Sequence, residues 1–309
     1  MSRPLYAGFD LGGTQLKFGL IDQAGDLIFK GSVDTPSTID GLMELLKTTW
    51  RDLRGSATGS VAGCGFGFPG IFSLRERKIL KSPNYPGLDS LDLFGALSRF
   101  IEVPLWVDND ANLAAYGEWA CGAGRGTQSL VLLTIGTGIG SGIILEGKLW
   151  HGKCGFAGEL GHVVVNPEGE ICKCGVRGCL ETESAAPKII KNYLDIRKIK
   201  ENLSAEEICG RAKEGEAAAR QSFARAGYYL GIGLGIVINF LNPEMIILGG
   251  GVMNSGEYLL VPALEEARKR SYGASFACCR IERAVLGNDA GVIGAASWAK
   301  GQLSFKARE

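Results

Sequence analysis

The sequence predicts an α/β protein made of two similar halves. Predicted strands alternate with predicted helices along the 309 residues, which is the pattern of the α/β class. One strand–turn–strand–turn–strand pattern occurs twice, about 124 residues apart. Glycine is also unusually frequent, at 46 of 309 residues, and we expect these glycines to serve turns and close backbone approaches.

The first copy of the pattern opens the chain and is followed by a helix, two strands and a second helix. Hydrophobic alternation and turn residues define its strands. The predicted elements are strands Leu5–Asp10, Leu16–Ile21 and Leu27–Lys30, helix 39–53, strands Val61–Phe68 and Leu105–Val107, and helix 111–120.

The second copy places Thr134 opposite Asp10 and Gly136 opposite Gly12. An irregular polar stretch over 151–183 follows it, and the remainder is mostly helical, with a capping box at Ser204–Glu207. The predicted elements are strands 130–134, 139–145 and 148–150, helix 216–241, strand 245–248, helix 257–270, strand 280–286 and helix 290–300.

Composition excludes several classes of protein. A hydrophobic content of 46% is enough for a buried core, and the balance of 33 basic and 33 acidic residues argues against a nucleic-acid-binding protein. The longest apolar run, Tyr228–Leu241, is shorter than the ~20 residues of a membrane span. No signal peptide is evident, and the odd number of cysteines, nine, is typical of reduced thiols. We therefore expect a cytoplasmic enzyme that does not bind membranes.

Three cysteines and a histidine predict a metal site. His162, Cys172, Cys174 and Cys179 lie within 18 residues, and a Cys₃His set is a ligand group for a closed, structural zinc ion. The alternative is a chance cluster in a cysteine-rich chain. The bunching of the trio beside one of only two histidines favours zinc.

The two glycine turns predict a phosphate-binding site. Asp10 ends a strand beside the bare amides of Gly12 and Gly13 and the hydroxyl of Thr14, a set that could hold hydrated Mg²⁺ and phosphate oxygens. The Thr134–Gly138 turn repeats the amides and hydroxyls without the carboxylate. A single turn of this kind is explained by a hairpin, but two in matching frames favour a nucleotide between two lobes.

Other phosphate motifs do not fit. The chain has no Walker loop. One dinucleotide-type glycine pattern, Gly65–Gly70, contains Pro69 and leads into a strand-like segment rather than a helix, so we discard it.

Acidic residues supply a candidate base. Asp108, Asn109 and Asp110 sit between a strand and a helix; they can serve simply as N-caps, or Asp110 can act as a general base at the mouth of the sheet. From the residues alone, we expect Glu159, Glu181 and Glu183 to be solvated surface carboxylates.

Essentially the whole chain resembles the ROK family (repressors, open reading frames and sugar kinases) of the actin-like, hexokinase-type ATPases. The most specific parts are Gly158–His162 and Cys172–Glu181, which are similar to the family signature and its zinc loop. The resemblance implies two ribonuclease H-like α/β lobes around a cleft. The implied small lobe is 1–118, with the C-terminal helix at about 296–309 packed back on it, and the large lobe is 119–295.

The resemblance also implies roles for individual residues. Asp110 matches the catalytic base and His162 a sugar contact that also binds zinc through its other nitrogen. This changes the interpretation of Glu159 and Glu181 to sugar contacts. The implied sugar ligands are Gly70, Asn84, Asn109, Asp110, Glu159, His162 and Glu181; the implied ATP and Mg²⁺ contacts are Asp10, Gly12, Gly13, Thr14, Lys17, Thr134, Gly136, Thr137, Gly138, Gly249 and Gly250.

The implied activity is ATP-dependent phosphorylation of a hexose, with glucose favoured because glucokinases are common among stand-alone members. N-acetylmannosamine or N-acetylglucosamine kinases are alternatives, because pocket shape decides between such sugars. A non-catalytic sugar sensor is disfavoured by the presence of Asp10 and Asp110, and polyphosphate is a less favoured donor. A repressor is disfavoured because no helix-turn-helix precedes Leu5. The family often forms homodimers, although the apolar helix at Tyr228–Leu241 is more simply core.

Overall fold

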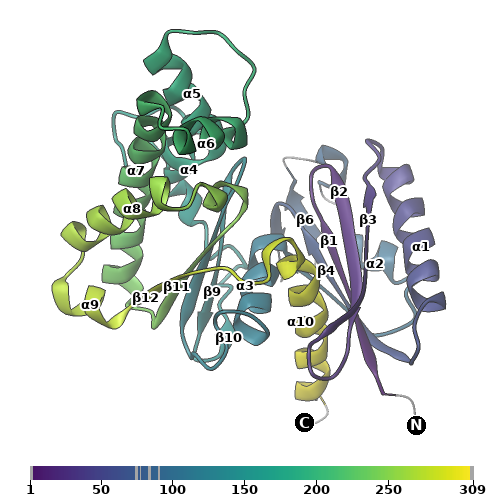
Figure 1. The fold of residues 1–309 in the computed structure, drawn as a ribbon. Coiled ribbons are helices and arrows are strands. Elements are labelled where there is room, and N and C mark those ends of the chain that lie inside the picture. Colours follow the sequence, from purple (N-terminus) through teal and green to yellow (C-terminus); the bar gives the residue numbers. More distant parts are fainter. Residues whose placement is uncertain (1–2, 74–75, 77, 83–84, 90, 307–309) are drawn as a thin grey trace. The chain divides into compact units, whose positions relative to one another are not determined.

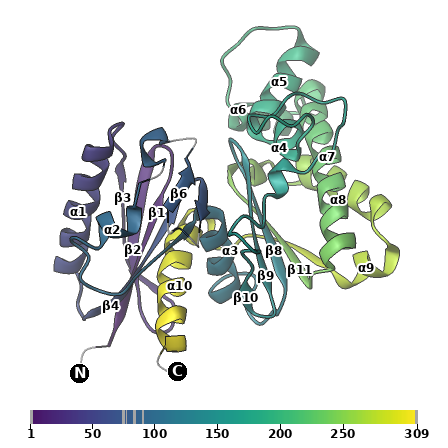
Figure 2. The same ribbon diagram turned by 180° about the vertical axis from the view of Figure 1, so that it is seen from behind.

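The structure is a computed structural model that describes residues 3–306, apart from 74–75, 77, 83–84 and 90. The chain forms two compact units. Unit 1 contains Met1–Thr127, Gly142–Gly158 and Val285–Glu309, and unit 2 contains Gln128–Ser141 and Glu159–Ala284. Figures 1 and 2 show the elements of each unit from opposite sides.

The first sheet has five strands in the order β3-β2-β1-β4-β7. The first three strands pair antiparallel as a meander, and β4 and β7 run parallel to β1. Its strands are β1 (Leu5–Leu11), β2 (Gln15–Ile21), β3 (Leu27–Asp34), β4 (Val61–Phe68) and β7 (Leu105–Asn109).

Alternation along β1 and β4 gives this sheet two different faces. Phe9 and Phe66 stack at 4.3 Å between ring centroids and belong to the core cluster that includes α1 (Ile39–Gly55). Gly8 and Gly65 point the other way, and a Cβ on either would overlap the backbone of α10 (Ala290–Lys306). The missing side chains therefore let α10 pack directly on the sheet (Figure 1).

The second sheet repeats the same layout in the order β10-β9-β8-β11-β12. Strands β8, β11 and β12 are parallel, and β10 pairs antiparallel with β9. This repetition confirms the predicted α/β fold with two similar halves. Its strands are β8 (Leu130–Ile135), β9 (Ile139–Leu145), β10 (Lys148–Leu149), β11 (Met245–Gly249) and β12 (Arg280–Arg283).

The helices of unit 2 pack around α7 (Ala217–Leu241). Gly227 and Gly231 on α7 lie so close to the backbone of α8 (Glu257–Arg270) that a Cβ on either would overlap it. Within the described residues, α7 is also the one helix long and apolar enough to cross a membrane, and half of its apolar window is buried in the protein, as in a core helix. The other helices of the unit are α4 (Leu180–Ser184), α5 (Ala186–Arg197), α6 (Ala205–Lys213) and α9 (Gly273–Cys278).

Most predicted elements lie within a few residues of the observed ones, and the predicted capping box opens α6. The last strand ends at Arg283 rather than at Leu286, because its partner β11 gives way to a glycine turn after Gly249. The last helix continues to Lys306 rather than Lys300. Strands and α-helices that the sequence analysis did not assign are β5 (Ile71–Ser73), β6 (Lys78–Lys81), α2 (Leu93–Leu97), α4, α5 and α9.

The contact between α10 and α3 (Asp110–Ala120) gives a test of this packing. A Cβ at Gly294 would overlap the carbonyl oxygen of Leu113, so we expect Gly294→Ala to lower the free energy of unfolding by about 1–3 kcal/mol. Gly210 in α6 faces open space, so Gly210→Ala should raise it by about 0.5–1 kcal/mol. Thermal or urea denaturation followed by circular dichroism measures both. Equal effects of the two substitutions would contradict the close approach of α10 to α3.

Candidate functional site

The first glycine turn joins β1 to β2. The N–H of Gly12 donates to the carbonyl of Gln15 at 2.8 Å, which closes the hairpin, while Gly13 and Thr14 are exposed. The hydroxyl of Tyr85 lies 3.1 and 3.3 Å from the carbonyl oxygens of Gly12 and Gly13. Tyr85 therefore braces the turn from its carbonyl side, a role that the sequence analysis missed.

Asp10 stands at the carboxyl end of β1, beside this turn. It pairs with Lys17 across the hairpin and with Gly67 of β4. Burial raises the pKa of Asp10, and the positive charge of Lys17 opposes that rise. The Lys17 ammonium itself donates to the carbonyl of Asn288 at 3.3 Å. The Asp10 carboxylate also fills the space that a side chain at Gly291, in the first turn of α10, would occupy.

Asn109 and Asp110 lie at the junction of β7 and α3. The Asn109 side chain accepts from the N–H groups of Ala111 and Asn112, so it is the N-cap that the simpler interpretation predicted. Its amide nitrogen donates to the carbonyl of Gly70 at 3.0 Å; among the described residues this is the one bond of that nitrogen, which has a second N–H to donate. The Asp110 carboxylate accepts from the N–H of Ala111 at 2.9 Å.

Asp108, just before this pair, is buried and bonded to His151. The Nε2 atom of His151 lies 2.6 Å from a carboxylate oxygen of Asp108. The sequence analysis noted Asp108 only as part of a capping triplet. His151, the one histidine outside the metal cluster, was the available signal, but it lies 43 positions from Asp108 in the sequence.

The second glycine turn, between β8 and β9, is tied to Glu181. The N–H of Gly136 donates to the carbonyl of Gly138 at 2.9 Å, and Thr137 is exposed. A carboxylate oxygen of Glu181 accepts from the N–H of Ile139 at 2.9 Å, and a Cβ at Gly138 would overlap that oxygen. The structure therefore brings Glu181 to this turn.

A third glycine segment lies beside the second turn. Gly249 ends β11 and pairs in register with Thr134, whose hydroxyl donates to the carbonyl of Gly140 at 3.4 Å. Gly250 has φ +89°, and a Cβ there would overlap the backbone of Ile135. Glycine is thus required at Gly250 both by its backbone conformation and by this close approach.

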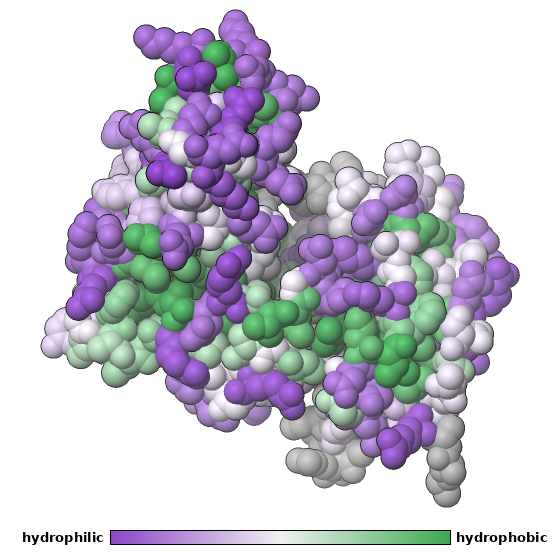
Figure 3. Space-filling model, in the orientation of Figure 1, coloured by the Kyte–Doolittle hydropathy of each residue, from purple (hydrophilic) through white to green (hydrophobic). Residues whose placement is uncertain are grey.

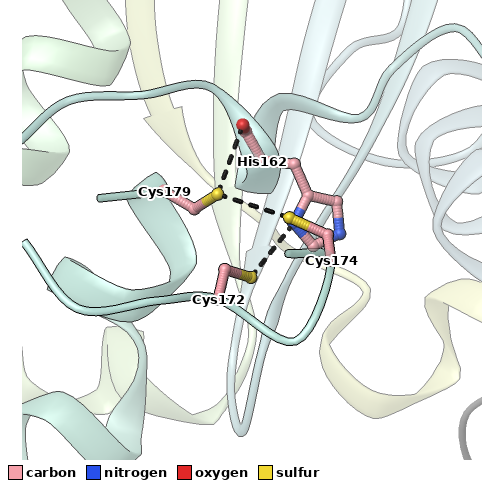
Figure 4. A group of neighbouring side chains, drawn as sticks. All are labelled: His162, Cys172, Cys174 and Cys179. Carbon is pink, nitrogen blue, oxygen red and sulfur yellow. Dashed lines mark hydrogen bonds between the residues drawn. The ribbon is translucent and has the colours of Figure 1, made fainter. Parts of the chain in front are cut away.

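The predicted metal ligands form one cluster in unit 2 (Figure 4). One donor atom from each of His162, Cys172, Cys174 and Cys179 lies within 4.8 Å of all the others. The Sγ atoms of Cys174 and Cys179 are 3.6 Å apart, as are Cys172 Sγ and His162 Nδ1. Tetrahedral zinc–thiolate geometry places sulfur atoms about 3.8 Å apart. The cluster is therefore compatible with a structural zinc ion.

His162 faces the cluster with one nitrogen and Glu159 with the other. Its Nδ1 atom points to Cys172, and its Nε2 atom lies 3.9 Å from a carboxylate oxygen of Glu159. Partial burial raises the pKa of Glu159; the charge of His162 opposes the rise and that of Glu181 adds to it. The metal cluster and the candidate sugar contacts Glu159 and Glu181 are therefore neighbours in unit 2.

Glu183 departs from the sequence-based expectation. We expected a solvated surface carboxylate, but its side chain is fully buried, and the Lys188 ammonium lies 3.5 Å from it. That ammonium also bonds Glu170 at 2.8 Å. The carboxylate packs against Gly169 in the metal-binding loop, so it belongs to the support of that loop.

Gly70 and Asn84 are the remaining candidate sugar contacts. Gly70 has φ +123°, and a Cβ there would overlap the backbone of Lys81, so a glycine is required where the chain turns beside Asn109. Asn84 lies outside the described residues, and its predicted role stays a prediction.

The chain matches a family model described as the ROK family over residues 6–302. The chain belongs to the ROK family. A glucokinase from Halalkalibacterium halodurans is 37% identical over 95% of this chain and 94% of the relative. A xylose repressor from Caldicellulosiruptor bescii is 31% identical over 93% of this chain and 76% of the relative. ROK membership was predicted from the sequence and is confirmed.

Solved structures of ROK proteins have the same fold. The ROK hexokinase from Thermus thermophilus superposes with a TM-score of 0.88, at 31% identity, over 97% of this chain and 99% of that one. A ROK glucokinase from Streptomyces griseus, in complex with glucose and AMPPNP, gives a TM-score of 0.81 at 30% identity over 96% and 99%. The hexokinase-like fold is therefore confirmed for this ROK protein.

The metal cluster of this ROK protein can be tested by elemental analysis. We expect the purified chain to hold about one equivalent of a divalent metal ion. Cys179→Ser should reduce it below about half an equivalent and lower the melting temperature, because a buried ligand is lost. Cys154 is exposed and lies outside the cluster, so Cys154→Ser is the matched control and should retain the metal. The site would be contradicted by a wild-type chain that purifies without metal and has the same melting temperature as the Cys179→Ser variant.

Proposed function

We propose that the protein transfers the terminal phosphoryl group of ATP to the 6-hydroxyl of a hexose, with glucose as the preferred acceptor. Its ROK membership and its 37% identity to a glucokinase support this function. The observation that carries it is local to unit 1. Asp10 and Asp108 lie on one row across β1, β4 and β7, so the glycine turn and Asp110 follow the carboxyl ends of strands in the same sheet.

In unit 1 the proposed roles follow from these positions. Asp110 is the general base for the sugar hydroxyl. Asn109 offers its remaining N–H to a sugar hydroxyl, and Gly70 holds Asn109 in place through its carbonyl. Asn84 is proposed as a further sugar contact. The exposed Gly13 and Thr14, on the hairpin that the Gly12 N–H closes, serve the phosphates and the magnesium ion of ATP together with Asp10 and Lys17.

In unit 2 the second glycine turn serves the nucleotide and the metal loop serves the sugar. The Thr134–Gly138 turn offers amides and hydroxyls to the phosphates, and Gly249 and Gly250 present backbone to the adenosine. Glu159 and Glu181 are proposed as acceptors for sugar hydroxyls, and the Nε2–H of His162 is proposed as a donor to a sugar oxygen. The neighbouring hydroxyls of a sugar suit acceptors that are held in fixed positions.

The chemistry needs positioning and charge neutralisation more than covalent help. Phosphoryl transfer passes through a loose transition state, with charge spread over the phosphoryl oxygens. Magnesium bound to ATP would neutralise part of that charge. The chain's own contribution is to orient the nucleotide on its amides and to accept the hydroxyl proton on the carboxylate of Asp110.

We infer that the metal of the cysteine cluster is zinc. Three thiolates and one imidazole nitrogen are its preferred donors, and four protein ligands leave no open position for catalysis. Zinc would hold His162 by Nδ1 and so fix the ring whose Nε2 faces Glu159. It acts in this proposal as a structural support for the sugar contacts.

Two other functions are weighed against this one. The 31% identity to a xylose repressor favours a sugar-responsive regulator as the second candidate, whereas retention of both Asp10 and Asp110 favours catalysis. A kinase for N-acetylmannosamine or N-acetylglucosamine would use the same base and differ in pocket shape. An ADP-release assay over glucose, mannose, allose and both N-acetylhexosamines separates these possibilities. Sugar binding without ADP release would favour the regulator.

The base assignment gives a direct test. Asp110→Asn removes the proton acceptor, so we expect kcat to fall about 10²–10⁴-fold, while glucose still binds in calorimetry. Asp195 lies exposed on α5, and Asp195→Asn is the matched control that should leave kcat unchanged. An Asp110→Asn enzyme with near wild-type kcat would remove Asp110 from the mechanism.

We further propose that the protein acts in the cytoplasm, where ATP is available. We also propose that it forms a homodimer through the α7–α9 region. Phe240 and Tyr272 are 85% and 74% exposed. Asn239 accepts from the N–H of Tyr272 at 2.7 Å, which brings the two aromatic residues to the same end of α7. Figure 3 shows apolar residues over α8, α9 and β12 on this part of unit 2.

A charged residue in this apolar region should break the dimer. We expect Phe240→Asp to convert a dimer to a monomer in size-exclusion chromatography with light scattering, because an unpaired carboxylate is costly to bury. Ile28 is exposed on β3 in unit 1, and Ile28→Asp should leave the dimer intact. A monomeric wild-type protein at micromolar concentration would contradict the proposal.

A further inference from the structure

Asp108 and His151 form a buried pair next to the proposed base. The Asp108 side chain is 3% exposed and that of His151 is 15% exposed, and their oxygen and nitrogen atoms are 2.6 Å apart. The carboxylate only accepts hydrogen bonds, so Nε2 carries the proton that lies between them. Neither side chain has a role in the function proposed above.

The Asp108 carboxylate binds Asn109 and Asn112, which flank Asp110 in the sequence. One of its oxygens accepts from the N–H of Asn109 at 2.7 Å and from the Nδ2 atom of Asn112 at 3.0 Å. Asn109 directly follows Asp108 on β7, and Asn112 lies in the first turn of α3. The orientation of this one carboxylate therefore determines how the end of the strand meets the start of the helix.

His151 holds the other oxygen of that carboxylate and is itself fixed. Its ring lies 6.0 Å from the ring of Trp298 on α10, and Trp298 packs at 5.0 Å on Tyr116 of α3. The carbonyl of His151 accepts from the N–H of Ala157 at 3.1 Å, which closes the loop that follows. The N–H donor thus comes from a rigid part of unit 1.

The geometry points to His151 and Asp108 as positioning residues for phosphoryl transfer, an assignment that rests on the proposed kinase function. Among the described residues, His151 is the donor to the second oxygen of Asp108. Without that donor the buried carboxylate has an unsatisfied oxygen and rotates toward another hydrogen-bond partner. This rotation displaces the N–H of Asn109, which is bonded to the same carboxylate. Asp110 then loses its alignment with the sugar hydroxyl, and an error of about 1 Å is enough to slow such a reaction about 10²-fold.

Two substitutions of His151 separate hydrogen bonding from packing. Gln places an amide N–H close to the position of Nε2 but lacks the ring, whereas Phe keeps a ring against Trp298 but lacks the donor. We expect His151→Gln to keep kcat within about threefold of wild type and His151→Phe to lower it at least about tenfold. The KM for ATP should stay within about twofold in both variants, since the hydrogen bonds of Asp108 go to Asn109, Asn112 and His151.

Melting temperatures and glucose binding by calorimetry are recorded for each variant. If His151→Phe does not fold, the smaller His151→Asn, whose amide falls short of Asp108, takes its place with the same expected loss. A Phe variant within twofold of the wild-type kcat overturns the assignment, as does equal loss in the Gln and Phe variants. The assignment is also overturned if kcat and the KM values for ATP and glucose change across the variants only in proportion to the loss of melting temperature, because a purely structural role would give that result.

The same measurements distinguish this inference from the proposed function. A wild-type chain that releases no ADP with any sugar overturns the kinase function, and the positioning role falls with it. An active wild-type enzyme with an unaffected His151→Phe variant keeps the kinase function and removes the positioning role alone.

Discussion

The pairing of β1, β4 and β7 is the constraint on which the proposed chemistry depends. Parallel register places Asp10, Gly67 and Asp108 on one row, so two acidic positions lie two strand spacings, about 10 Å, apart at one edge of the sheet. Gly67 stands between them, and its Cα lies close to both the Asp10 carboxylate and the backbone of Asp110, which a Cβ there would just touch. Because the backbone ladder sets this spacing, it depends little on the mobility of any side chain.

Unit 2 reaches similar rigidity by different means. Its irregular loop has few backbone ladder bonds, so side chains determine its shape. The four metal ligands gather one end of the loop, and buried Glu183 with Lys188 supports the other. Glu181 extends from the same region to accept the N–H of Ile139 at the glycine turn. The candidate sugar contacts and the candidate phosphate turn are therefore linked through one carboxylate.

The sequence was sufficient for the fold because the decisive signals are local. Strand alternation, turn glycines and the capping box at Ser204 each involve neighbouring residues, and the repeated meander then predicted two similar α/β halves, which the two sheets show. The metal cluster was also predictable, because its thiols lie close together in the chain. The Asp108–His151 pair and the burial of Glu183 were not, because both arise when segments distant in sequence come together, and no periodic pattern records such contacts.

Asn109 shows that a structural role and a ligand role need not be alternatives. Its carbonyl oxygen is used by the cap of α3 and one N–H by Gly70, which leaves a single N–H whose direction is fixed by the other bonds. A side chain with no structural role would lose rotational freedom on binding sugar, at a cost of about 1 kcal/mol. Capping removes that freedom when the protein folds, so the helix start is already organised for a ligand. The same reasoning applies to Asp110, whose backbone is held between the strand and the helix that Asp108 joins.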